Sequence, residues 1–340
     1  MRKVIISDPT LRDGNHAVRH QLNREQIRAY ASAAELARIP IVEVGHGNGL
    51  GASSMQVGES LLSDRDMLET AREVLKLSKL GVHVMPGWAM IDRDLKPAVE
   101  IGVDVFRVGS HCTEADTTQR HISYVREQGR EAFGVLMMSH MASKEVLLEE
   151  AHKMVSYGAE AIVLMDSAGA FLPNNVTEKV GYLVQNLPST AVGYHGHNNL
   201  GLAIANSIAA VDAGATIIDG CARGFGAGAG NTQLEVLVAV FERLGIQTGI
   251  DLYKVLDCGD LAEASLVEVV PTISSVSVVS GIAGVFSGFA KHVFRVAKEY
   301  QVDPRDIFFE LGRRKVVAGQ EDMIIEVALN LREKKDLNAG

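Results

Sequence analysis

The chain has 340 residues, of which 47% are hydrophobic and 22% charged, a composition typical of globular proteins and not of disordered or fibrous ones. The formal net charge is −9 and no basic stripe is visible, so nucleic acid is not an expected partner. Three widely spaced cysteines, no N-terminal leader and no long apolar run predict a reduced, cytoplasmic protein that does not enter a membrane.

Short strand-like runs alternate with longer amphipathic runs through most of the chain. The strand-like runs are continuous and β-branched, as expected for strands buried on both faces, at 4–7, 41–44, 82–85, 103–108, 132–137, 161–165, 191–194 and 216–219. The runs after them predict helices at 24–38, 64–80, 93–101, 113–128, 144–157, 175–185, 200–213 and 232–244. Doubly wound sheets alternate in the same way, but eight near-equal units favour a closed α/β TIM (β/α)8 barrel.

The pattern changes after Gly245. A mixed helical run at 251–268 and a Ser- and Val-rich stretch at 272–279 precede helices predicted at 283–300, 304–311 and 322–332. We therefore divide the chain into a barrel catalytic domain, residues 1–250, and a helical C-terminal subdomain, residues 251–340. The subdomain carries no catalytic motif, so it is either a packing layer or lid, or a docking surface.

Four ionisable residues follow the first predicted strand: Asp8, Arg12, Asp13 and His16. In a barrel of parallel strands the catalytic residues lie at this carboxyl end. Polar residues follow five further strands in the same way, namely Glu43 and His46, His111, Ser139 and His140, Asp166 and Ser167, and His195 and His197. We expect them to gather at one rim of the barrel, with His46, His111 and His140 in structural or supporting positions.

His195-Gly196-His197 is the strongest metal-binding signal. Residues two apart on a strand point to the same side, so both imidazoles can reach one ion. Together with Asp13 they would leave positions open for water and a substrate, and these mixed nitrogen and oxygen donors admit Mn²⁺, Fe²⁺, Co²⁺ or Zn²⁺. A pair of hydrogen-bonded structural histidines and an iron oxygenase site are the alternatives.

Three further residues can take chemical roles beside such a metal. The fixed cation of Arg12 can hold an oxygen on which negative charge develops, oriented by Glu43, or else form a structural ion pair. His16 titrates near neutral pH and can act as a general base, or else cap a turn. Ser167 begins a small-residue loop whose hydroxyl and N–H groups can bind a carboxylate.

A glycine-rich loop at 224–231 follows the eighth predicted strand. It lacks the dinucleotide-binding spacing and stands in the last strand–helix unit instead of the first. We interpret it either as backbone donors that face an anionic substrate or as a tight packing element.

These motifs resemble a known family. Asp8-x-Thr10-Leu11-Arg12-Asp13-Gly14 with His195-x-His197 is similar to the HMG-CoA lyase-like (DRE-TIM) metallolyase superfamily. Within this superfamily the chain resembles the 4-hydroxy-2-oxovalerate aldolases of meta-cleavage pathways. The segments that carry the closer resemblance run to the end of the chain, at 43–47, 110–116, 136–141, 226–235 and 319–324.

The resemblance implies a class II pyruvate aldolase, a lyase that cleaves a 4-hydroxy-2-oxo acid such as 4-hydroxy-2-oxopentanoate to pyruvate and an aldehyde such as acetaldehyde. In this family a divalent metal, usually Mn²⁺, binds the 2-keto acid. Asp13, His195 and His197 match its ligands. The physics agrees, because a metal beside an arginine stabilises an enolate oxygen where the charge forms.

The same resemblance implies further roles and a partner. Arg12 matches the residue that stabilises the pyruvate enolate, His16 the base that takes the 4-hydroxyl proton, and Ser167 a binder of the substrate carboxylate. The family commonly associates with a CoA-acylating acetaldehyde dehydrogenase, forming a hetero-oligomer in which the aldehyde passes through a channel. We place the docking surface on residues 283–332.

The sequence departs from the family near residue 286. The family has a Gly-Tyr-Ala-Gly-Val-Tyr-Ser stretch, which here reads Gly-Ile-Ala-Gly-Val-Phe-Ser at 281–287, so Phe286 stands where an active-site tyrosine is expected. Losing this hydroxyl makes the aldehyde-binding end of the site more apolar. We therefore expect relaxed stereochemical control or a different aldehyde, with Phe286 contacting that part of the substrate.

Two other functions are alternatives. An acyl-CoA-dependent Claisen condensing enzyme or lyase of the same superfamily would share the metal and Arg12 but would need a CoA thioester. A non-catalytic subunit that stabilises a dehydrogenase would show no carbon–carbon lyase activity. The complete set of Arg12, Asp13, His16, His195 and His197 argues against this second alternative.

Overall fold

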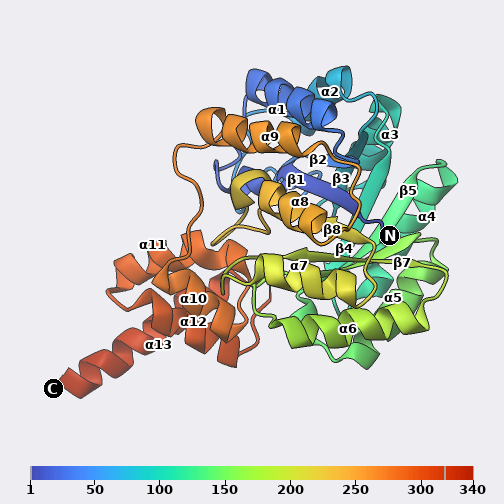
Figure 1. Cartoon of the computed structure of the whole chain (residues 1–340). Helices are drawn as coiled ribbons and strands as arrows, with labels where there is room; N and C mark the ends of the chain where they lie inside the picture. Colours follow the sequence, from blue (N-terminus) through green and yellow to red (C-terminus); the bar gives the residue numbers. More distant parts are fainter. Residues whose placement is uncertain (1, 318, 340) are drawn as a thin grey trace.

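The computed structural model describes residues 2–317 and 319–339 and contains the expected closed barrel (Figure 1). Eight parallel strands pair in chain order, and the eighth pairs back onto the first, where Ile5 lies opposite Ile217. The strands are β1 (Ile5–Leu11), β2 (Ile41–Val44), β3 (Lys79–Val84), β4 (Val105–His111), β5 (Glu131–Met137), β6 (Ala161–Asp166), β7 (Ala191–Gly196) and β8 (Ile217–Asp219). The helices that follow them are α1 (Arg24–Ala37), α2 (Asp64–Val74), α3 (Lys96–Ile101), α4 (Gln119–Glu127), α5 (Lys144–Ser156), α6 (Pro173–Asn186), α7 (Ala203–Asp212) and α8 (Leu234–Arg243).

Five more α-helices follow in the part of the chain that the structure describes: α9 (Leu252–Ser265), α10 (Ser275–Ala283), α11 (Ala290–Tyr300), α12 (Pro304–Arg313) and α13 (Asp322–Ala339). The last four pack around their own apolar core, which includes Val293, Phe308 and Val327. Figure 1 shows these four helices grouped beside the barrel, with α13 projecting away from it. None of the helices in the described residues is long and apolar enough to cross a membrane.

The interior of the barrel is built in layers by the alternation of side chains along the strands. One layer is apolar and includes Ile41, Val105 and Phe133. Two residues further along β2 and β4 the inward side chains are Glu43 and Arg107, which are fully buried and charged. The polar layer therefore lies directly beneath the carboxyl ends of the strands, and it supports the rim where we expected the site.

Several predicted elements end or begin elsewhere; β4, for example, runs to His111 and not to Val108. The helix predicted at 64–80 is wrong at its end, because α2 stops at Val74 and β3 begins at Lys79. The intervening turn is fixed from outside, since the Glu35 carboxylate accepts hydrogen bonds from the N–H groups of Leu77 and Ser78. Local apolar spacing could not reveal this distant cap.

The helix predicted at 283–300 is wrong at its start, because α11 begins only at Ala290. Residue 283 is the last of α10, and Gly284 then adopts a left-handed backbone with φ of 65°. A short 3₁₀ turn, Ser287–Phe289, leads into α11. The first strand is longer than expected and runs through Asp8 to Leu11. The interruption in the helices brings Phe286 to the barrel mouth.

The helix α9 packs with the barrel. It lies against α1 and α8, and Val255, Cys258 and Ala262 belong to the same apolar core as the barrel helices. A division of the chain at residue 250 stays a prediction. From this packing we propose that the boundary between barrel and subdomain follows α9.

Candidate metal centre and active site

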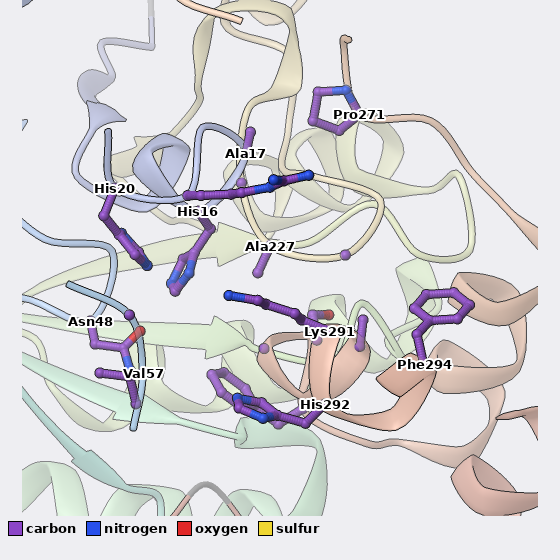
Figure 2. A pocket seen from close by; sticks show the side chains of 18 of the residues that line it. His16, Ala17, His20, Asn48, Val57, Ala227, Pro271, Lys291, His292 and Phe294 are labelled. Atoms are coloured by element: carbon purple, nitrogen blue, oxygen red, sulfur yellow. The ribbon is translucent and has the colours of Figure 1, made fainter. Parts of the chain in front are cut away.

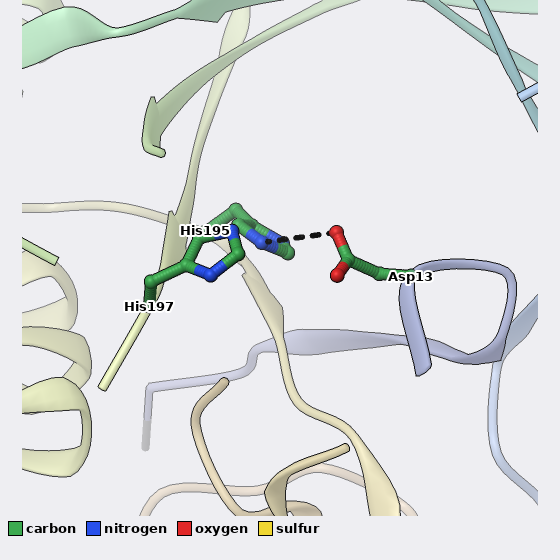
Figure 3. Close-up of side chains that lie close together, drawn as sticks. All are labelled: Asp13, His195 and His197. Carbon is green, nitrogen blue, oxygen red and sulfur yellow. Dashed lines mark ion pairs between the residues drawn. The ribbon is translucent and has the colours of Figure 1, made fainter. Parts of the chain in front are cut away.

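Three buried residues at the carboxyl ends of β1 and β7 come together as the sequence predicted (Figure 3). One ligand atom from each of Asp13, His195 and His197 lies within 4.8 Å of the others, and His195 Nε2 is 3.8 Å from Asp13 Oδ2. Asp13 Oδ1, His195 Nε2 and His197 Nδ1 have no hydrogen-bond partner among the described residues. Buried polar atoms normally have partners, so three clustered residues that each carry an unpartnered one fit a divalent cation.

The electrostatics of Asp13 and His197 suit metal binding. Burial would raise the pKa of Asp13, but Arg12 and the neighbouring histidines lower it below its usual range, so the side chain is a carboxylate. Burial lowers the pKa of His197 to about 4, against the opposing effect of Asp13. A neutral imidazole is the form that ligates a metal, so at neutral pH both groups are in the binding state.

His195 is oriented by a carboxylate on the neighbouring strand. Its Nδ1 lies 2.8 Å from Asp219 Oδ2, at the end of β8. We assign the hydrogen to Nδ1, which donates to Asp219 and leaves the lone pair of Nε2 facing Asp13. This is the usual arrangement of a metal-binding histidine, in which the second ring nitrogen fixes the ring.

A chain of buried charges links this carboxylate to Arg12. Arg107 donates to Asp219 at 2.6 Å and also to Glu43. Glu43 in turn accepts a hydrogen bond from Arg12 Nε at 3.0 Å. The contact expected between Arg12 and Glu43 is therefore present. Two arginines alternate with two carboxylates, which leaves no buried charge in the chain without an opposite neighbour.

Arg12 is held along one edge and open along the other. Besides Glu43, its Nη1 donates to Asp13 Oδ2 at 2.7 Å and to the Gly47 carbonyl at 3.2 Å. Its Nη2 is buried and has no partner among residues 2–317 and 319–339. A guanidinium fixed in this way offers a free N–H edge beside the three candidate metal ligands.

A small inner cavity of about 90 Å³ opens at these residues. Arg12, Asp13 and His197 line one part of it, and His16 lines another. His16 enters the cavity because residue 47 is a glycine, where a Cβ atom would lie 2.5 Å from His16 Nε2. Burial lowers the pKa of His16, and Asp13 opposes this effect. His16 is thus an imidazole placed to exchange a proton with a bound molecule.

A wider outer cavity of about 400 Å³ adjoins the inner one, and both share His16 and Phe286. Figure 2 shows His16 and His20 on the barrel side and Lys291 and His292 of α11 on the other. Lys291 extends across this opening toward His16. The barrel and the C-terminal helices together therefore form the path to the candidate metal centre.

Phe286 and Ser167 are placed differently. Phe286 lines both cavities, and its ring packs edge-on against Phe289 with 5.7 Å between centroids. Ser167 is fully buried and lines neither cavity, and its Oγ accepts a hydrogen bond from the Met138 N–H. Its backbone carbonyl accepts from the Ser287 N–H at 3.2 Å. The structure thus brings Phe286 to the cavity beside the candidate metal ligands and leaves Ser167 outside the residues that line it.

The glycine-rich loop at 224–231 closes the outer cavity. Gly226, Ala227 and Gly228 line that cavity, and Asn231 fixes the loop by donating to the Phe225 carbonyl at 2.9 Å. His46 is a supporting residue, as expected, because its Nε2 lies 3.0 Å from the Gly58 carbonyl oxygen and its ring stacks on His20.

Three site residues were missed from the sequence: Arg107, Asp219 and His83. Each lies within a predicted strand or directly beside its predicted end, among apolar residues. A charged residue inside an apolar run is the signal that could have found Arg107 and Asp219. These positions become interior ones only when the barrel closes.

The closed barrel and its buried His–His–Asp group define a class of barrel enzyme with a candidate metal centre. The family model described as HMGL-like matches residues 3–262, and the DmpG-like communication domain matches residues 271–333. Two curated relatives are both named 4-hydroxy-2-oxovalerate aldolase. One from Pectobacterium atrosepticum is 64% identical, covering 98% of this chain and 97% of the relative, and one from Spirochaeta aurantia is 62% identical, covering 97% of each. The chain belongs to the 4-hydroxy-2-oxovalerate aldolase family and is a carbon–carbon lyase.

More distant solved structures share the fold. The HMG-CoA lyase from Brucella melitensis has a TM-score of 0.68 at 16% identity, covering 78% of this chain and 99% of that one. The carboxyl transferase domain of Rhizobium etli pyruvate carboxylase, solved with pyruvate and biocytin, has a TM-score of 0.80 at 15% identity, covering 98% of this chain and 61% of that one. These likenesses support the barrel architecture.

Proposed function

We propose that the protein cleaves 4-hydroxy-2-oxopentanoate, or a close analogue, to pyruvate and an aldehyde such as acetaldehyde in a reaction that depends on a divalent metal. The observation that carries this proposal is the clustering of Asp13, His195 and His197, each with an unpartnered buried polar atom, beside the open edge of Arg12. The relatives named 4-hydroxy-2-oxovalerate aldolase support the substrate.

The proposed metal is Mn²⁺, held by Asp13, His195 and His197. It supplies Lewis-acid polarisation of the oxo group of the substrate. Mn²⁺ follows from the family resemblance, and the mixed nitrogen and oxygen donors fit it. These donors also fit Co²⁺ or Fe²⁺, so metal exchange with activity measurements will rank the ions.

The protein residues carry the remaining chemistry. His16 takes the proton of the 4-hydroxyl group as the bond between C3 and C4 breaks, and C4 becomes the carbonyl carbon of the departing aldehyde. The electron pair of that bond forms the C2–C3 double bond of the enolate, and the unpartnered Nη2 of Arg12 holds the negative charge that develops on the C2 oxygen. The proton that His16 took balances the proton that C3 then receives to give pyruvate. We also propose that Ser167 donates its hydroxyl hydrogen to the substrate carboxylate, since its oxygen already accepts the Met138 N–H.

The partner we propose is a CoA-acylating acetaldehyde dehydrogenase bound to α10–α13. The match of residues 271–333 to the DmpG-like communication domain supports this partner. NAD and CoA would belong to the dehydrogenase. The outer cavity adjoins the same helices, so an aldehyde leaving the inner cavity would pass them. Co-expression followed by size-exclusion chromatography would test the complex, and separate elution at micromolar concentrations would contradict it.

The first experiment is pyruvate release from racemic 4-hydroxy-2-oxopentanoate by the purified protein with Mn²⁺, with and without EDTA. We expect release only with the metal. The variant His195→Ala should lose both bound metal and activity, whereas His152→Ala, an exposed histidine on α5, should keep both. Full activity in EDTA, or after loss of all metal, would end the proposal.

A further inference from the structure

A buried histidine of β3 lines the inner cavity without a partner of its own. His83 is 2% exposed, and neither ring nitrogen makes a hydrogen bond within residues 2–317 and 319–339. Burying a polar group without a hydrogen bond costs free energy of folding. An imidazole that faces a substrate cavity in this condition is placed to bind something that enters the cavity.

The neighbouring strands make room for this ring. A Cβ atom at Gly109 of β4 would lie 2.9 Å from His83 Cε1 and 3.2 Å from Nε2. A Cβ atom at Gly49 would lie 3.3 Å from His83 Cδ2 and 2.5 Å from the His83 carbonyl oxygen. Larger residues at either position would push the imidazole out of its place, so the site around the ring is built for it.

His83 stays neutral. Burial is the main cause that lowers its pKa, to about 3, and Arg12 adds to this effect while Glu43 opposes it. At neutral pH the ring therefore carries one N–H donor and one acceptor nitrogen. It can therefore hold a polar atom in place by donating or accepting a hydrogen bond.

The inner cavity has both polar and apolar lining residues. Arg12, Asp13 and His197 suit an oxo acid, whereas Met85, Met137, Met165 and Phe286 contribute thioether and phenyl groups. His83 lines the same small cavity as His16, the residue proposed to take the proton from the C4 oxygen. An oxygen that reaches His16 therefore lies in the cavity that His83 lines.

We propose that His83 is a positioning residue that hydrogen-bonds to the C4 oxygen of the substrate, and so holds the aldehyde half of the molecule against the enolate. This inference rests on the proposed aldolase function. Phe286 presents no hydroxyl to this half, so His83 supplies the hydrogen bond from β3. His16 takes the proton from the same oxygen, and His83 fixes where that oxygen lies.

The test uses the metal-loaded full chain in the synthesis direction, with acetaldehyde and pyruvate varied separately. His83→Leu removes the hydrogen bond, His83→Asn retains a polar atom near Nδ1, and His83→Gln retains one near Nε2. We expect His83→Leu to lower kcat/KM for acetaldehyde roughly tenfold while KM for pyruvate changes less than twofold. One of the two polar variants should recover most of the loss and thereby identify the nitrogen that binds. His121→Leu, in a histidine of α4 that lines neither cavity, is the control.

Two results would overturn the proposal. Either His83→Leu uses acetaldehyde as well as the wild type does, or it weakens pyruvate and acetaldehyde equally. If His83→Leu fails to fold, His83→Asn and His83→Gln provide the test. An equal loss of kcat/KM for acetaldehyde in these two variants would count against a positioning role. Deuterium exchange into the methyl group of pyruvate by the wild type, without aldehyde, separates the two proposals. No exchange and no cleavage would refute the aldolase, whereas exchange with an insensitive His83 would refute this inference alone.

Discussion

Replacing Asp219 by asparagine should weaken metal binding without touching a metal ligand. The carboxylate accepts from His195 Nδ1 at 2.8 Å and from Arg107 at 2.6 Å. Both donors bond the same oxygen, Oδ2, so the amide oxygen of Asp219→Asn can still accept from them, but without the negative charge that balances Arg107 and strengthens the hydrogen bond to His195. Removing a carboxylate that orients a ligating histidine typically costs about 10- to 100-fold in metal affinity.

The size of the effect on stability follows from the affinity. At a free metal concentration of 100 times the wild-type Kd, binding stabilises the folded state by about 2.7 kcal/mol. A tenfold weaker variant would gain about 1.4 kcal/mol at the same concentration, and a hundredfold weaker one about 0.4 kcal/mol. Asp219→Ala should also destabilise the metal-free protein by about 3 to 5 kcal/mol, because it leaves Arg107 buried beside fewer opposite charges.

Isothermal titration with Mn²⁺ and denaturant unfolding with and without the metal would measure both quantities. Asp104→Asn is the matched control, because Asp104 pairs with Arg72 and caps Leu80 N–H outside the site. It should change stability and leave the affinity for Mn²⁺ intact. If Asp219→Asn binds Mn²⁺ as tightly as the wild type, the proposed role of the charge chain in orienting His195 is refuted.

Three other changes test separate parts of the structure. Phe286→Tyr adds a hydroxyl to a residue that lines both cavities. We expect the variant to discriminate more strongly between the C4 enantiomers of 4-hydroxy-2-oxopentanoate in a cleavage assay. Unchanged discrimination would contradict the role given to Phe286. Lys291→Met removes a cation from the outer cavity and should raise KM for the anionic oxo acid about two- to fivefold at low salt. The increase in KM should be smaller in 0.5 M NaCl, because salt screens the charge. Lys298→Met on the same helix is the control and should leave KM unchanged. Burial lowers the pKa of His46 from 6.5 to about 4, so the unfolded chain binds more protons between these values and stability rises with pH through this window. Metal-free protein should therefore lose about 2 kcal/mol of unfolding free energy from this group when the pH falls from 7 to 5, and His46→Gln should lose less. Urea titrations at the two pH values would measure both losses, and equal losses in the wild type and the variant would contradict the role given to His46.

The barrel and its candidate metal group could be predicted because both depend on regular patterns. Eight β-branched runs imply eight strands, closure brings the end of β1 near the end of β7, and the alternation along β7 places His195 and His197 on one side. These regular patterns therefore sufficed to predict that Asp13 lies close to both histidines.

The remaining features depend on contacts that no local pattern contains. Arg107 and His83 lie at inward positions of β4 and β3, where a charged or polar side chain is tolerated only because Glu43 and Asp219 or neighbouring glycines surround it. The end of α2 is fixed by Glu35, which is far away in sequence. Such pairings appear only once the chain is folded.

Phe286 contributes both to the core of the C-terminal helices and to the wall of the inner cavity. Its side chain packs on the core of α10–α13 and also lines the inner cavity. The C-terminal subdomain is therefore not an exchangeable module for partner choice alone. In a chimera that joins this barrel to the helices of a relative, the incoming helices would bring their own wall for the aldehyde. Docking preference and substrate preference would then be inherited together.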